Sequence, residues 1–185
     1  MRTRPAEASG LEHALLGLLR AHPMHAYEMH VQLLRTEQLG LVWHLKQGNL
    51  YALLSRLEAE GYLASTTEPQ DTRPPRKMLS LTARGQTSFA HWLATPVEHG
   101  RDFRQEFLAK LYFATRDGPA TVHDLLSRQR VACEQWLDEL QAQHAALNAD
   151  RPFEHLVLRF RVGQLDATLR WLDECAAVFA APSPR

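Results

Sequence analysis

The sequence predicts a mainly α-helical protein: an N-terminal winged helix-turn-helix with a two-stranded wing, followed by a C-terminal three-helix dimerisation domain. Three observations support this fold class. The N-terminal half orders its expected elements as helix, helix, helix, strand, strand, helix. Residues 48–63 carry leucines on one helical face and small residues on the other, and a proline-rich basic loop follows them. The C-terminal half shows only helical patterns.

Two short helices are expected before residue 48. Residues 11–20 form an apolar helix that ends before Pro23, because proline disfavours the helical conformation of the residue preceding it. A second helix is expected over residues 26–37, where Tyr27, Val31 and Leu34 recur at i, i+4 and i+7. That spacing predicts an apolar stripe along one side of the second helix.

The third helix has two contrasting faces. A helical wheel gathers four leucines on one side as a core-facing stripe, namely Leu50, Leu53, Leu54 and Leu57. The opposite side is small and carries hydrogen-bonding residues at its margin, namely Gly48, Ala52 and Ser55 beside Asn49, Tyr51 and Arg56. Such a face can approach another surface closely, as a helix does in a major groove of DNA. Gly61 suits the left-handed backbone position after the helix ends.

Two antiparallel strands and a fourth helix are expected next. Residues 63–68 and 77–81 alternate in polarity, as strands do, and the loop over residues 69–76 contains three prolines. Thr82 is a plausible N-cap for a helix that continues to about Thr95. Its inward residues are expected to be Phe89, Trp92 and Leu93.

The best domain boundary lies in residues 96–100, which divides the chain into residues 1–97 and 98–185. Three helices are expected in the second domain, over residues 101–116, 121–148 and 153–180. The last of them alternates apolar steps of four and three residues, as in a coiled-coil seam. Packing within its own subunit and pairing with a second copy both explain this stripe, which comprises Leu158, Val162, Leu165, Leu169, Leu172, Ala176 and Phe179.

Composition narrows the location and partners of the protein. The formal net charge is zero, so affinity for nucleic acid would depend on local clustering, as at Arg73, Arg76, Lys77 and Arg84. Cys133 and Cys175 show no CxxC spacing, which favours a reduced cytoplasmic protein. We find no apolar run near the ~20 residues that span a bilayer, so no membrane partner is expected.

Four short patterns lie in register along the chain. An apolar helix precedes Pro23-Met24-His25-Ala26-Tyr27-Glu28, and Gly48-Asn49-Leu50-Tyr51 precedes Arg56-Leu57-Glu58 and Gly61. Arg76-Lys77 and Leu81-Thr82-Ala83-Arg84-Gly85 follow, and then residues 102–114. Together these patterns resemble the PadR family of bacterial transcriptional regulators. Asn49 stands where that family usually has Thr, and Thr72 stands where many members have Gly before the wing arginine.

The resemblance implies a homodimer that binds double-stranded, pseudo-palindromic operator DNA. It implies a repressor that a small effector or another signal releases. Independently of the resemblance, a cleft where the two domains meet, lined by some of the chain's aromatic residues, is a hypothesis for the effector site. No cofactor, metal or catalytic residue is expected. The three nearby histidines His22, His25 and His30 lack a firm ligand spacing, and we find no nucleophile elbow or phosphate-binding glycine loop. A winged-helix module that binds only proteins is the alternative function.

The predicted DNA-binding residues fall in three groups. Gln47, Asn49 and Tyr51 occupy the start of the third helix, where helix-turn-helix proteins contact bases and phosphates. Lys46 and Arg56 are expected at phosphates, although Arg56 could pair with Glu60 instead. Tyr27 could pack or reach a phosphate. The wing contributes Arg73, Arg76 and Lys77.

Overall fold

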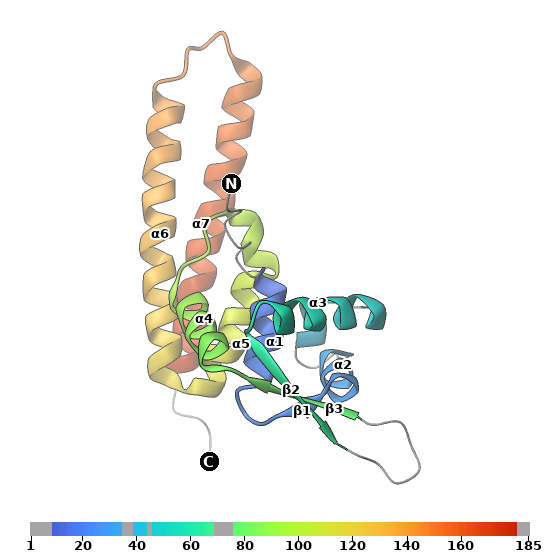
Figure 1. The fold of residues 1–185 in the computed structure, drawn as a ribbon. Helices are drawn as coiled ribbons and strands as arrows, with labels where there is room; N and C mark the ends of the chain where they lie inside the picture. The colour runs from blue at the N-terminus through green and yellow to red at the C-terminus, as the bar shows by residue number, and fades with distance from the viewer. Residues whose placement is uncertain (1–8, 35–38, 44–45, 69–75, 181–185) are drawn as a thin grey trace. The chain divides into compact units, whose positions relative to one another are not determined.

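The computed structural model describes residues 9–34, 39–43, 46–68 and 76–180, and it is mainly helical with one small sheet (Figure 1). The chain forms two compact units. The first contains residues 1–94 and 104–113, and the second contains residues 95–103 and 114–185. Residues 104–113 therefore return to the first unit after the chain has entered the second.

The first unit holds the four helices expected in the N-terminal domain and, in addition, part of a helix that was expected in the second domain. They are α1 (Gly10–Leu18), α2 (Ala26–Leu34), α3 (Gln47–Ala59), α4 (Ala83–Ala94) and the first two turns of α5 (Glu106–Asp117), with a 3-10 turn at Leu39–Leu41. Ser9 begins α1 with a capping box: its hydroxyl accepts from the Glu12 amide, and the Glu12 carboxylate accepts from the Ser9 amide. Thr82 caps α4 as predicted, because its hydroxyl oxygen accepts the Gly85 N–H at 3.1 Å.

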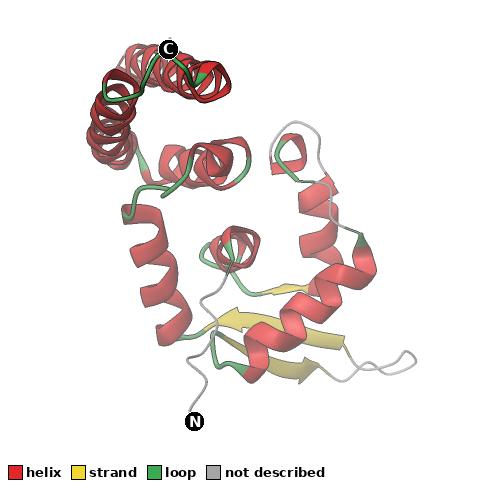
Figure 2. Cartoon of the chain, turned by 90° about the horizontal axis from the view of Figure 1, so that it is seen from above, coloured by secondary structure: helices red, strands yellow, loops and turns green. Residues whose placement is uncertain are grey.

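A three-stranded antiparallel sheet completes the first unit. Its order is β1 (Met24–His25), β3 (Arg76–Leu81), β2 (Leu63–Glu68), and Figure 2 shows the strands side by side. The two wing strands were predicted, and Leu63 pairs with Leu81 while Ser65 pairs with Leu79. Strand β1 was not predicted, because two residues are too few to show an alternating pattern.

Helix α2 faces its unit differently from the prediction. The expected stripe is mostly exposed, with Tyr27 67%, Val31 37% and Leu34 54% accessible. Met29 and Leu33 are the buried residues instead. These two also lie at i and i+4, so spacing alone could not distinguish the two sides of this short helix.

The core of the first unit joins α1, α4 and α5. Leu15 and Leu16 of α1 are fully buried, and the Phe89 and Phe113 rings meet edge to face with centroids 5.2 Å apart. Gly17 lies against these rings: a Cβ added there would be 2.5 Å from Phe113 and 2.6 Å from Phe89. The close approach of α1 to both aromatic rings therefore depends on this glycine.

The second unit is a long helical hairpin. Figure 1 shows α6 (Pro119–Ala145) and α7 (Pro152–Ala180) running side by side. The helix predicted over residues 101–116 is instead a 3-10 turn at Gly100–Arg104 followed by α5. Within this unit the buried Gln129 side chain accepts the Val97 N–H at 2.8 Å, which holds the segment before α5 against α6.

The apolar stripe of α7 packs within its own chain. Leu165 and Leu172 are 7% and 2% exposed against α6, and Val162 and Leu158 border hollows shared with that helix. Of the two explanations of the stripe, these burials favour packing within the subunit at Leu165 and Leu172, because buried side chains offer little surface to a second copy. Among the described residues, we find no helix long and apolar enough to cross a membrane.

Candidate nucleic-acid interface

Helix α3 presents the small face that the sequence predicted. Leu50, Leu54 and Leu57 are buried, whereas the residues of the opposite side are exposed, namely Lys46, Gln47, Gly48, Asn49, Tyr51, Ala52 and Ser55. A Cβ added at Gly48 would meet no described atom within 4 Å. The first turns of α3 thus combine amide, phenol and ammonium groups with an unobstructed surface.

Arg56 connects α3 to α1. Its Nε donates to Glu12 Oε1 at 2.7 Å, and its Nη2 also contacts this carboxylate. The Glu12 side chain is 1% exposed, whereas that of Arg56 is 51% exposed. The expected alternative partner was Glu60, on the same helix, but the structure selects a carboxylate that lies 44 residues earlier in the chain.

Electrostatics favour the charged state of this pair. Burial raises the pKa of Glu12, but hydrogen bonds from Arg56 and Ser9 outweigh that effect and lower its pKa overall. The hydrogen bond to Glu12 raises the pKa of Arg56. Arg56 keeps N–H groups that do not contact Glu12, because a guanidinium carries five donors. It can therefore hold α3 in place and still face an anion.

Glu58 connects α3 to both wing strands. Its carboxylate accepts from the Ser65 hydroxyl on β2 and lies 3.3 Å from Lys77 Nζ on β3. The hydrogen bond from Ser65 lowers the pKa of Glu58, and Lys77 lowers it further against the raising effect of burial. Lys77, predicted as a wing contact, is 64% exposed and already has a carboxylate beside it.

Arg73, Arg76 and Tyr27 complete the set of predicted DNA-binding residues. Arg73 lies outside the described residues, and so does Thr72. Arg76 begins β3, where its backbone pairs in register with Glu68. Tyr27 is 67% exposed at the start of α2, so its ring does not pack into the core.

The clustered histidines have structural contacts. His25 Nδ1 donates to the Lys77 carbonyl oxygen at 2.9 Å, which joins β1 to β3, and His22 Nε2 lies 3.5 Å from Glu28. Within the part of the chain that the structure describes, we find no group of three or more His, Cys, Asp or Glu residues placed to hold a metal ion.

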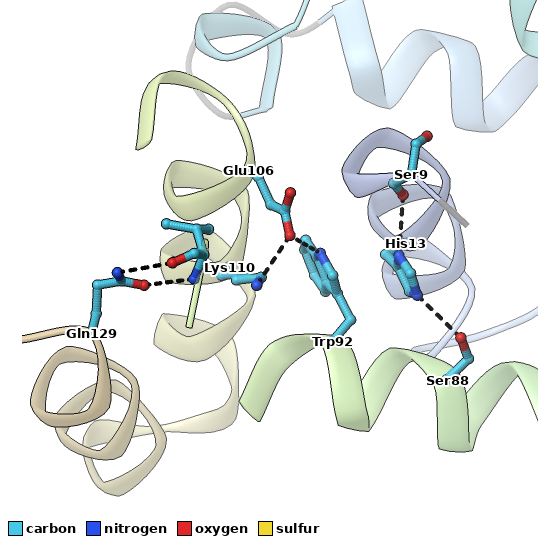
Figure 3. A network of polar contacts seen from close by, with 8 residues as sticks. Ser9, His13, Ser88, Trp92, Glu106, Lys110 and Gln129 are labelled. Atoms are coloured by element: carbon cyan, nitrogen blue, oxygen red, sulfur yellow. Dashed lines mark hydrogen bonds and ion pairs between the residues drawn. The ribbon is translucent and has the colours of Figure 1, made fainter. Parts of the chain in front are cut away.

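A largely buried polar network, which was not predicted from the sequence, joins α1, α4 and α5 (Figure 3). The His13 ring stacks on Trp92 with centroids 5.3 Å apart and bonds the Ser9 carbonyl and the Ser88 hydroxyl, each at 3.1 Å. Because the carbonyl can only accept, Nδ1 carries the proton and Nε2 accepts from Ser88. Burial lowers the pKa of His13, so the ring is neutral near pH 7.

Glu106 and Lys110 extend the network. The Trp92 indole donates to Glu106 at 2.8 Å, and the 1% exposed Lys110 lies 3.1 Å from the same carboxylate and 5.3 Å from the Trp92 ring centroid. The available sequence signal was a lysine within an apolar run, at i+4 from a glutamate. Such a lysine needs a buried partner, since an unpaired buried charge is very costly.

An exposed small-faced helix, followed by a two-stranded wing that is tied to it, defines a winged helix-turn-helix. A family model described as "Transcriptional regulator PadR-like family" matches residues 15–91, and one described as "Virulence activator alpha C-term" matches residues 103–180. The negative transcriptional regulator PadR of Bacillus subtilis is 31% identical over 138 residues, which cover 75% of this chain and 69% of that protein. This chain belongs to the PadR-like family and is a transcriptional regulator.

One further relative and two solved structures are similar over most of their length. The probable transcriptional regulator Rv1176c of Mycobacterium tuberculosis is 25% identical over 182 residues, covering 90% of this chain and 95% of that protein. A crystal structure of Bacillus subtilis PadR in complex with operator DNA is 25% identical, covers 92% of this chain and 99% of that chain, and has a TM-score of 0.47. For Bacillus subtilis PadR in complex with p-coumaric acid, identity is 24%, coverage 94% and 100%, and the TM-score 0.43.

Proposed function

We propose that this regulator is a dimeric repressor that binds double-stranded, pseudo-palindromic operator DNA. The observation that carries the proposal is the outward side of α3, which is small and exposed in its first turns. Each subunit would insert that end of α3 into a major groove while the wing follows the neighbouring backbone. Such a regulator acts by binding rather than catalysis, in the cytoplasm where a bacterial chromosome lies.

The proposal gives each predicted DNA-binding residue a role. Gln47, Asn49 and Tyr51 contact base edges, and the Asn49 amide can pair bidentately with an adenine. Lys46 contacts phosphate, as do the outer N–H groups of Arg56 and the Tyr27 hydroxyl. In the wing, Arg73 and Arg76 enter the minor groove and Lys77 binds phosphate.

Dimerisation is proposed through a different side of α7 from the one the sequence suggested. Phe153, Leu156 and Phe160 are 73%, 65% and 65% exposed, and their three- and four-residue spacing places them on one side of the helix. A two-fold pairing of this patch would bury three large apolar side chains per subunit. A cluster of exposed apolar side chains of this kind is a common mark of a protein interface.

A small effector is proposed to release the DNA. Bacillus subtilis PadR has been crystallised both with operator DNA and with p-coumaric acid, and the family membership of this chain favours a comparable regulation. An effector that binds one dimer geometry better than the other would shift the population away from the DNA-binding state.

DNA binding is tested with the promoter fragment upstream of the chain's own gene. We expect the wild-type Kd to rise steeply between 50 and 200 mM salt, by roughly 10³-fold or more if about six phosphates are contacted. Asn49→Ala should weaken operator binding by about 1–3 kcal/mol, through one lost base contact. Gln86→Ala removes an exposed amide from α4 and should change nothing. Salt-independent binding, or equal effects of both substitutions, would favour the protein-interaction alternative.

Dimerisation is tested by analytical ultracentrifugation. Phe160→Glu places a charge in the proposed patch and should convert the dimer to a monomer, with a loss of operator affinity. Ala177→Glu places the same charge at an exposed position elsewhere on α7 and should leave the dimer intact. A dimer that tolerates Phe160→Glu would rule out this patch as the interface.

A further inference from the structure

A pocket of about 380 Å³ lies within the second unit, between the first turns of α6 and the last turns of α7. Its walls are mostly apolar and include Val122 and Leu126 of α6 with Leu172, Ala176 and Phe179 of α7. Binding sites for small molecules have volumes of about 300–1,000 Å³ and combine such walls with a few polar groups. The pocket fits that description without any residue from the first unit.

The floor and the mouth of the pocket differ in exposure. Val122, Leu126 and Leu172 are 2%, 5% and 2% exposed, so the floor is held by side chains that are already packed into the hairpin. Ala176 is exposed and Phe179 is 36% exposed. The lining of the pocket therefore combines side chains packed into the hairpin with two that solvent reaches, Ala176 and Phe179.

Charge at the margin of the pocket limits the class of ligand. Arg130 forms an ion pair with Asp173 across the two helices, and its Nε lies 2.9 Å from Glu134. Two carboxylates thus surround one guanidinium, which disfavours an anionic ligand at this edge. The Ser127 hydroxyl and the His123 imidazole also line the pocket, and both can bond to a hydroxyl group.

We propose that this pocket binds a small, neutral, mainly apolar molecule, of the size of two or three aromatic rings with a single hydrogen-bonding group. This inference rests on the proposed function, because only a repressor that an effector releases gives the bound molecule a regulatory role. It places the effector within the hairpin rather than at the junction of two domains. A ligand wedged between α6 and α7 would favour one spacing of these helices, and so one geometry of the dimer.

A second copy of the chain is a less suitable occupant. The exposed patch at Phe153, Leu156 and Phe160 is in the first turns of α7, whereas the pocket uses Leu172 to Ala180. Leu156 and Ala176 are separated by roughly 30 Å along the axis at 1.5 Å per residue. A dimer centred on the patch therefore does not require the pocket to be filled.

The test uses the full-length protein and N-phenyl-1-naphthylamine, a neutral dye in which one N–H group joins a phenyl ring to a naphthalene. The fluorescence of this dye rises in apolar sites. Ala176→Phe places a ring in the mouth of the pocket, and Ala177→Phe places the same ring at the next exposed position, which does not line it. We expect wild type and Ala177→Phe to bind the dye with the same Kd, and Ala176→Phe to bind it at least tenfold more weakly. Thermal unfolding of both variants checks that the fold is retained.

Three results would overturn the site: no dye binding by wild type, equal binding by Ala176→Phe and Ala177→Phe, or a loss of the dimer in Ala176→Phe alone. The third would show that a second copy covers the pocket. Operator binding is measured in parallel without dye. If wild type fails to bind DNA while Ala176→Phe alone loses the dye, the proposed function fails and the pocket stands, so the two failures are distinguishable.

Discussion

At the scale of single residues, two buried ionisable groups of the first unit have lowered pKa values. Glu12 is almost fully buried and neutralises Arg56, and His13 is buried as a neutral ring between Ser9 and Ser88. Neither group lies on the exposed side of α3. Both contribute to function only by holding α1, α3 and α4 together, so stability measurements are the appropriate tests.

His13 should make the protein less stable as the pH falls through the ordinary range of histidine. Its folded-state pKa is below the unfolded value of about 6.5, so the unfolded chain binds more protons in that interval. The contribution is complete above the unfolded pKa and is lost as the pH decreases below it. Urea unfolding at pH 7.5 and 5.5 measures this loss. His13→Gln should reduce the difference between the two pH values, and an unchanged difference would contradict the assignment.

The stabilising effect of Glu12 should be lost only at lower pH than that of His13, as is usual for a paired carboxylate. Its folded-state pKa lies below the unfolded value of about 4.3, so its stabilisation is present above that value and decreases as the pH falls through the folded pKa. Glu12→Gln should cost about 1.5–3 kcal/mol at pH 7, the range for a hydrogen bond to a charged group. The substitution should also reduce the fall in the free energy of unfolding as the pH decreases. If the curves of unfolding free energy against pH run parallel for wild type and variant, other carboxylates dominate the acid dependence.

At the scale of secondary-structure elements, α3 is positioned from two sides. Arg56 ties it to α1, and Glu58 ties it to β2 and β3 through Ser65 and Lys77. These contacts lie on the turns of α3 that follow the exposed first turns. The exposed first turns of α3 can thus remain open while the helix itself is fixed.

Removal of the Glu58 charge should alter the wing rather than the fold. In Glu58→Gln the amide oxygen can still accept from Ser65, whereas Lys77 loses its ionic partner and becomes available to phosphate. We expect operator binding a few-fold tighter, with a log–log salt slope steeper by up to ~0.9, the value for one phosphate contact. Glu60→Gln removes the same charge two residues further along, at the C-cap of α3, and is the control. Weaker binding in Glu58→Gln would mean that the carboxylate positions Lys77 for DNA.

Two glycines should respond oppositely to the same substitution. Gly17→Ala would place a methyl group 2.5 Å from Phe113, and overpacking of this kind costs about 1–3 kcal/mol. Gly48→Ala meets open space and should stabilise α3 by up to ~1 kcal/mol through helix propensity. The same methyl group should weaken operator binding if that side enters a groove. Chemical unfolding and a DNA titration of both variants separate these effects.

At the scale of the whole molecule, different kinds of contact stabilise the two units. The first has a mixed core of aliphatic, aromatic and buried polar groups, whereas the second depends on one long helical pair with exposed apolar residues outside it. Cys133 and Cys175 are buried in that pair, and burial raises the pKa of both thiols, which favours a packing role over a redox role. The exposed Phe153, Leu156 and Phe160 patch is best explained by the dimer proposed above.

The sequence by itself determined the order of the main helices, the two wing strands and the exposed side of α3. These features depend on local spacing: leucines at helical intervals in α3, alternation in β2 and β3, and Thr82 at an N-terminus. Helices and strands repeat at fixed residue intervals, so the spacing of apolar residues in the sequence reveals them before the fold is known.

Only the tertiary structure decided which faces and charges meet. Tyr27, Val31 and Leu34 have the spacing of a core stripe yet lie outside, and Arg56 selects Glu12 rather than the nearer Glu60. The stripe at Leu165 and Leu172 is satisfied by α6 of the same chain, which left Phe153, Leu156 and Phe160 exposed. The physical reason is that burial and ion pairing depend on distances between segments far apart in sequence, and periodicity within one segment carries no information about them.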